Sequence, residues 1–232
     1  MKFVNGGLIL SGNKEQKYLD VFCSKKQFVL MKDNPGFLLL LRLSRVINAI
    51  SFSLITVYEL NGKSSPSNRR QLVNSFLFTC GILYEGLEVA KGLGKYYRHI
   101  EEFNEGLGKI ISNKDIKKLQ SKVLYKLRNK IVFHFDEEVF SDIINDIDHE
   151  TYIFANGSKS SAKDLYFSLA DEIAINYVLS DFPDKENHEE IFIQIITDVT
   201  NTALDFKRSS EKLIAKVLAD MKWDIRECEN FT

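Results

Sequence analysis

Arg128, Asn129 and His134 are the residues of this chain whose types and spacing suggest chemistry. A guanidinium binds oxyanions through its planar fork, and an imidazole exchanges protons near neutral pH. All three lie in the short segment 127–136, which reads LRNKIVFHFD. No other part of the sequence suggests chemistry as clearly, so this segment is the candidate site.

The charge pattern changes sharply near residue 134. Seven basic residues and one acid lie between positions 114 and 130, whereas seven acids and no Lys or Arg lie between 136 and 150. Acids are favoured at a helix start and disfavoured at a helix end. We therefore expect a break between His134 and Asp136, with Asp136 as the cap of the next helix. Most residues of the two runs are expected to form solvated faces.

Apolar residues surround the candidate segment. On a helical wheel the preceding helix carries one apolar stripe, formed by Ile116, Leu119, Val123, Leu127 and Ile131. After Lys130, apolar side chains point in nearly every direction, and a helix that is apolar all round is buried all round. We therefore expect a second subunit to enclose this segment, with Arg128 and His134 at its edge.

The segment from Arg128 to His134 resembles the motif of the HEPN superfamily. In that motif a polar residue follows an Arg, four to six residues intervene before a His, and the domain is small and all-α. Here Asn129 follows Arg128 and five residues intervene before His134, whereas the commonest form has four. The resemblance in motif covers about ten residues, and the rest of the chain is similar only as a helical bundle.

The resemblance implies a metal-independent endoribonuclease without a cofactor, acting as a homodimer in a toxin–antitoxin or antiphage defence system. His134 would then move the proton of the ribose 2′-OH as general acid or base, and Arg128 would stabilise the scissile phosphate. Asn129 would orient the phosphate or the imidazole, and the products would be a 2′,3′-cyclic phosphate and a 5′-hydroxyl. Two copies of the motif would line one cleft across the dimer. Three lysines would attract the RNA in a salt-dependent manner, namely Lys122, Lys126 and Lys130.

Two other interpretations stay open. A HEPN-like helical module without catalysis would bind a protein partner, such as an antitoxin or a nucleotidyltransferase-type protein. A purely structural helical protein would instead keep Arg128 as a snorkelling side chain and His134 as a hydrogen-bonded core histidine. Cleavage of RNA without added metal, lost on changing either residue, separates the nuclease from the other two.

Composition limits the other classes of function. The formal net charge of −1 leaves no overall basic field for nucleic acid, so any basic site must be local. The three cysteines, Cys23, Cys80 and Cys228, form no CxxC pair, which argues against a zinc site or a disulfide framework and fits a reducing cytosol. No His falls into a metal-ligand spacing, so no metal is expected.

Helical patterns and short loops predict one all-α domain over residues 1–232, with helical N- and C-terminal extensions. The expected bundle consists of long antiparallel helices. Helices are expected at 13–33, 37–60, 69–93, 96–111, from 114 onward, at 161–180 and, as one or two helices, at 186–228. The stretch 151–160 contains Asn-Gly and is expected to form either a short β-hairpin or a loop.

The most apolar run, 37–60, has the length of a membrane span. Arg42, Arg45 and Asn48 lie inside it, and charges at mid-bilayer are costly, so a central helix buried on most sides is expected instead. The N-terminal residues do not form a convincing signal peptide, and a cytoplasmic protein without a membrane contact is expected. Glu85 and Glu88 are expected to pair with a basic neighbour such as Arg42 or Arg45.

Overall fold

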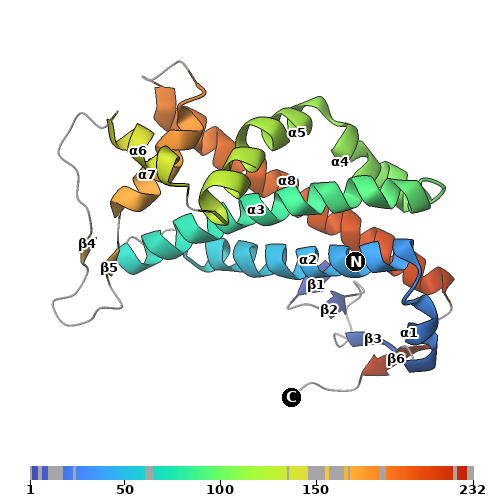
Figure 1. Ribbon diagram of the computed structural model, residues 1–232. Helices are drawn as coiled ribbons and strands as arrows, with labels where there is room; N and C mark the ends of the chain where they lie inside the picture. Colours follow the sequence, from blue (N-terminus) through green and yellow to red (C-terminus); the bar gives the residue numbers. More distant parts are fainter. Residues whose placement is uncertain are drawn as a thin grey trace.

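Three long helices organise the molecule, and the prediction of an all-α bundle is confirmed. The computed structural model describes residues 2–4, 7–9, 18–22, 25–60, 65–134, 136–145, 155–156, 165–166, 168–182, 187–221 and 224–228. Helices α2 (Pro35–Leu60) and α3 (Pro66–Tyr97) run antiparallel side by side, and α8 (His188–Asp220) crosses behind both (Figure 1). The expected helices at 37–60 and 69–93 are therefore present, slightly longer than predicted.

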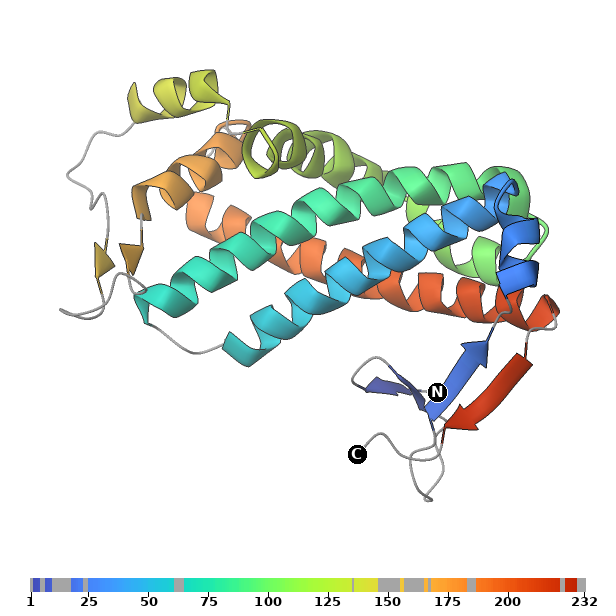
Figure 2. The ribbon, with the colours of Figure 1, turned by 60° about the horizontal axis from the view of Figure 1, so that its bottom comes forward.

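Shorter helices pack on this framework and leave one face of α2 exposed. Three of them, marked η, are π-helical. Their bounds are α1 (Lys25–Met31), η1 (Phe103–Gly108), α4 (Lys109–Ser112), α5 (Lys114–Leu119), η2 (Gln120–Leu124), η3 (Leu127–Val132), α6 (Glu137–Asn145) and α7 (Ser168–Leu179). In both ribbon views α3 lies between α2 and the chain from α5 to η3 (Figures 1 and 2).

Side-chain caps explain where α3 and α5 begin. Ser65 accepts a hydrogen bond from the Asn68 amide at 3.2 Å, and a proline follows it at the first helical position of α3. Asn113 accepts from the amides of Asp115 and Ile116 at the start of α5, which agrees with the helix expected from residue 114 onward. These caps satisfy amides that have no partner within the helix.

The core lies where α2, α3 and α8 cross. Its fully buried side chains come from all three helices and include Leu43, Ile50, Leu83, Leu87 and Phe206. Burying a side chain of this size contributes roughly 1.5–3 kcal/mol. Gly86 permits the close approach, because a Cβ atom there would lie 2.9 Å from both the Val46 and the Phe206 side chains.

The helices predicted at 13–33 and 186–228 are confirmed over α1 and α8, but strands take the place of helix in their outer parts. Strand β3 (Tyr18–Phe22) pairs antiparallel with β6 (Asp224–Cys228), and β1 (Lys2–Val4) pairs with β2 (Gly7–Ile9). Strand β3 reads YLDVF, and four of its five residues are aromatic or aliphatic, which suits a strand. Its partner lies at the other end of the chain, so local periodicity could not reveal the pairing.

A short strand pair also forms near the predicted hairpin. Strand β4 (Ala155–Asn156) falls inside the stretch 151–160, but it pairs with β5 (Leu165–Tyr166), beyond that stretch. The helix expected from residue 161 begins only with α7 at Ser168. The remaining residues of 151–160 lie outside the described part of the chain.

The expectation that the apolar run 37–60 is buried on most sides is wrong. One face of α2 packs on α3 and α8, while Arg42, Arg45 and Asn48 are exposed on the other. Helix α2 and the part Ser67–Tyr97 of α3 are both long and apolar enough to cross a membrane. Core helices of soluble proteins share that property, so length and composition alone assign no membrane.

Candidate functional site

The π-helix η3 carries Arg128 and Asn129 against α3. Helices of this type are rare, usually short, and frequent at functional sites. The helix ends at Val132, and Phe133 leaves the helical region with φ −120° and ψ −11°. The Asp136 amide then donates to the Lys130 carbonyl at 2.9 Å, while Asp136 Oδ1 accepts from the Glu138 amide at 3.1 Å. The predicted break and the predicted cap at Asp136 are confirmed.

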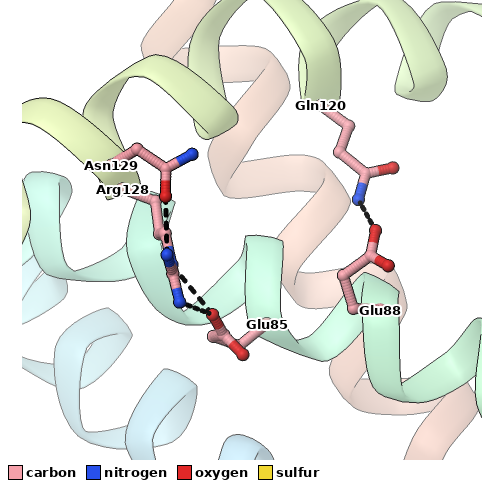
Figure 3. A network of polar contacts seen from close by, with 5 residues as sticks. All are labelled: Glu85, Glu88, Gln120, Arg128 and Asn129. Atoms are coloured by element: carbon pink, nitrogen blue, oxygen red, sulfur yellow. Dashed lines mark hydrogen bonds and ion pairs between the residues drawn. The ribbon is translucent and has the colours of Figure 1, made fainter.

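Glu85 of α3 holds the Arg128 guanidinium (Figure 3). Glu85 Oε1 accepts from Arg128 Nε at 2.9 Å and lies 2.8 Å from Nη2, and Asn129 Oδ1 accepts from Nη1 at 2.5 Å. An arginine has five N–H donors, so these contacts leave two without a partner among the described residues. The Arg128 side chain is 32% exposed, which leaves its fork accessible from solvent.

Each of the two glutamates of α3 pairs with a basic residue, as predicted, but the partners are Arg128 and Lys91 and not Arg42 or Arg45 of α2. Their carboxylates also face residues of η2 and η3 (Figure 3). Glu88 Oε1 accepts from Gln120 Nε2 at 2.8 Å and from Lys91 Nζ at 2.6 Å. Two carboxylates of α3 thus bind the segment 120–129. Glu88 does so through the Gln120 amide, and Glu85 does so through the Arg128 guanidinium.

Aromatic rings flank the guanidinium, and the sequence did not identify them. The Arg128 guanidinium carbon lies 5.9 Å from the Tyr84 ring centroid and 6.0 Å from that of Phe133, distances at which cation–π attraction contributes about 0.5–1 kcal/mol at exposed sites. The Tyr125 ring lies 6.0 Å from the Tyr84 ring. Tyr125 and Phe133 are about half exposed, so these rings form part of the surface.

Gly81 makes room for the Phe133 ring. A Cβ atom at this position of α3 would lie 3.0 Å from Phe133 and 3.2 Å from Val132. Phe133 is 45% exposed, so its ring is part of the surface and not of the core. The signal for its exposure is the helix end itself, because Phe133 follows the last residue of η3.

His134 lies just beyond the helix and is exposed. Within the described part of the chain it makes no hydrogen bond or ion pair. The alternative interpretation of His134 as a hydrogen-bonded core histidine is therefore wrong. Phe135, the next apolar residue of the segment, lies outside the described residues.

The three candidate lysines differ in their surroundings. Lys122 is exposed and has no ion pair among the described residues. Lys126 lies 2.5 Å from Asp181 and stands over the Tyr177 ring at 5.1 Å. Lys130 hydrogen-bonds Asp136, which raises the pKa of Lys130 and lowers the pKa of Asp136. Of these three lysines, Lys122 alone has no acidic partner within the part of the chain that the structure describes.

A cavity of about 590 Å³ adjoins η3 but does not include the candidate site residues. Ile131 and Val132 line it together with residues of α2, α3 and α7, whereas Arg128 and His134 do not. Among the described residues, no group of three or more His, Cys, Asp or Glu side chains is placed to hold a metal ion. The site is an open surface formed by the Arg128 guanidinium and the Tyr84 and Phe133 rings, and within the described residues no contact joins His134 or Lys122 to it.

No family model, curated protein or solved structure matches this chain. The class that the structure defines is therefore an all-α bundle with a candidate polar surface on a π-helical segment.

Proposed function

We propose that this protein is a metal-independent endoribonuclease of a toxin–antitoxin or antiphage defence system, acting in the cytoplasm as a homodimer. The observation that supports the proposal is that the Arg128 guanidinium is held in one orientation and is partly exposed to solvent. Glu85 and Asn129 hold the guanidinium and leave two N–H donors for a ligand, and an exposed imidazole follows six residues later. A guanidinium fixed in this way suits a phosphate oxygen.

The proposed reaction is an internal transesterification of RNA. The ribose 2′-oxygen attacks the adjacent phosphorus, the bond from phosphorus to the 5′-oxygen breaks, and a 2′,3′-cyclic phosphate and a 5′-hydroxyl form. His134 removes the proton of the 2′-OH, and the 5′-oxygen receives a proton from the imidazolium or from water. Arg128 donates to the non-bridging oxygens, whose charge increases in the transition state. Asn129 holds the guanidinium in the required orientation.

Glu85 limits what Arg128 contributes. Its carboxylate compensates the charge of the guanidinium, so Arg128 attracts phosphate weakly at long range and acts through directed hydrogen bonds. Long-range attraction of the RNA then depends on Lys122, the candidate lysine without an ion pair. Exposed rings at Tyr125 and Phe133 offer faces on which bases of single-stranded RNA stack.

A non-catalytic module that binds a protein partner, such as an antitoxin, is the second candidate. The Arg128–Glu85 ion pair favours it, because a structural guanidinium also needs a carboxylate. Under this candidate the exposed rings and Lys122 form a protein-binding surface without RNA cleavage.

Cleavage of RNA in the presence of a chelator tests the proposal. We expect wild-type protein to cut single-stranded RNA and to leave 2′,3′-cyclic phosphate ends. His134→Ala and Arg128→Lys are each expected to reduce the rate roughly 100-fold or more, since general acid–base catalysis and charge stabilisation contribute on that scale. Arg128→Lys keeps the charge and removes the fork.

His99→Ala is the matched control, because His99 is also an exposed histidine but lies in the turn that follows α3, outside η3. It is expected to leave the rate unchanged. Equal activity of wild type and both site variants would contradict the nuclease proposal, and so would cleavage that stops with chelator.

A further inference from the structure

Helix α2 exposes a row of large apolar side chains to solvent. These are Leu38 (43% exposed), Leu41 (39%), Phe52 (69%), Ile55 (52%) and Tyr58 (85%). Single exposed apolar residues are common on soluble proteins, whereas several large ones gathered on one face of a helix are typical of an interaction surface. The described parts of the chain leave this row uncovered.

The row follows the spacing of a coiled-coil seam. Exposed residues recur in alternating steps of three and four, at Leu38, Leu41, Arg45, Asn48, Phe52 and Ile55. A helix packs along its length against a second helix when a stripe repeats every 3.5 residues. We call these six residues the α2 seam. It extends for about 26 Å at 1.5 Å per residue.

The α2 seam lies opposite the buried face of the helix. Leu43, Ile47 and Ile50 are buried against the bundle, and they fall between the seam positions along the sequence. Helix α2 is therefore apolar on two opposite faces, of which the bundle covers one. A helix with two apolar faces is expected to have a neighbour on each.

We infer that the α2 seam pairs with the α2 seam of a second copy of this chain, in antiparallel orientation. The seam is nearly palindromic, with an apolar pair at each end and Arg45 and Asn48 in the middle. Antiparallel pairing places Leu38 opposite Ile55 of the second copy, Leu41 opposite its Phe52, and Arg45 opposite its Asn48. Apolar side chains thus meet apolar ones, and each Arg45 guanidinium donates to an Asn48 side-chain oxygen.

The charge of Arg45 determines whether the two α2 seams pair in parallel or antiparallel orientation. Parallel pairing in register would place the two Arg45 guanidinium groups against each other at the centre, and like charges at such a seam are unfavourable. Antiparallel pairing separates them and provides each with an amide oxygen. It also creates a two-fold axis, so the assembly closes as a dimer.

A lipid surface fits the α2 seam poorly. Arg45 and Asn48 lie in its middle, and Arg42 is exposed beside them, so insertion would bury charge among acyl chains. Between two protein helices, one central polar pair instead sets the register.

This dimer is independent of the proposed nuclease activity. Helix α3 lies between α2 and most of η3 (Figures 1 and 2), and Arg128 and His134 do not line the cavity that Phe52 of the seam shares with Ile131 and Val132. The interface of the proposed homodimer is therefore placed at the α2 seam and not at the shared cleft that the HEPN resemblance implies, and each copy carries its own Arg128 surface.

Sedimentation equilibrium tests whether the α2 seam forms a dimer interface. We expect the wild-type protein to have twice the mass of one chain and the variant Leu41→Glu/Ile55→Glu to have the mass of one chain, with helical content unchanged. Ile193→Glu is the matched control, because Ile193 is a large apolar residue exposed on α8, outside the seam. It is expected to stay dimeric. Phe52→Gln, a milder change at a side chain 69% exposed, is expected to weaken the dimer at least tenfold.

Disulfide trapping tests whether the two α2 seams pair in antiparallel orientation. The experiment uses protein in which Cys23 and Cys228 are replaced by serine. The buried Cys80 remains, since burial raises the pKa of its thiol and keeps it unreactive. We expect Leu38→Cys chains mixed with Ile55→Cys chains to cross-link to each other, whereas Leu38→Cys chains alone do not.

Several results would overturn the inference. These are a wild-type monomer throughout the concentration series, a dimer that persists in both seam variants, and binding of the monomer to lipid vesicles through the seam. Cross-linking of Leu38→Cys chains with themselves would overturn the antiparallel orientation.

Discussion

Arg128 has its position because of a residue 43 positions earlier. Glu85 holds two of its nitrogens and Asn129 a third, so the guanidinium has one orientation relative to α3. Arg128, Asn129 and His134 stood out in the sequence because they are near neighbours. Glu85, Tyr84 and Gly81 did not, since only the packing of η3 on α3 brings them to the site.

A double-mutant cycle measures how strongly this ion pair couples. Both side chains are about one third exposed, so solvent screens the pair, and we expect a coupling free energy of about 1 kcal/mol between Glu85→Gln and Arg128→Met in urea unfolding. The Glu105–Lys109 pair is far more exposed, and a coupling of about 0.3–0.5 kcal/mol is expected there. A value near zero for Glu85 and Arg128 would show that Glu85 does not hold the guanidinium.

At the scale of elements, helices were predictable wherever a cap or a break is local. The caps at Asn113 and Asp136 and the helix end before His134 all follow from residues within a few positions. The strand β3 was not predictable, because its partner β6 lies at the opposite end of the chain. The sequence also did not reveal that α2 exposes one of its apolar faces, since a strongly apolar run predicts a helix that is buried on most sides.

The link between η3 and α6 is expected to depend on pH. The hydrogen bond from Lys130 lowers the pKa of Asp136 in the folded protein, so this group stabilises the fold above the unfolded pKa of about 3.9 and loses that contribution as the pH falls through its lowered value. The difference in unfolding free energy between wild type and Asp136→Asn is therefore expected to be largest above about pH 5 and to shrink below about pH 4.

Urea titrations between acidic and neutral pH measure this difference. Asn at position 136 keeps a side-chain oxygen for the Glu138 amide, so the helix cap is retained and only the charge is lost. In a Lys130→Met background, Asp136→Asn is expected to change stability by a smaller amount with less dependence on pH. A difference that stays constant with pH in the wild-type background would argue against the Lys130–Asp136 link.

At the scale of the whole molecule, the α2 seam couples folding to association. A dimer that dissociates on unfolding is stabilised by mass action, so its melting temperature depends on protein concentration. For a chain of this length a tenfold increase is expected to raise Tm by about 2 °C. The variant Leu41→Glu/Ile55→Glu should show a constant Tm, measured by calorimetry over the same range.

The pairing of β3 with β6 ties the two ends of the polypeptide to each other. Removing either strand would leave its partner with a row of unpaired amides and carbonyls, which is a template for unwanted association. Shortening this protein from one end only is therefore a route to aggregates, whereas trimming both strands together removes the exposed edge.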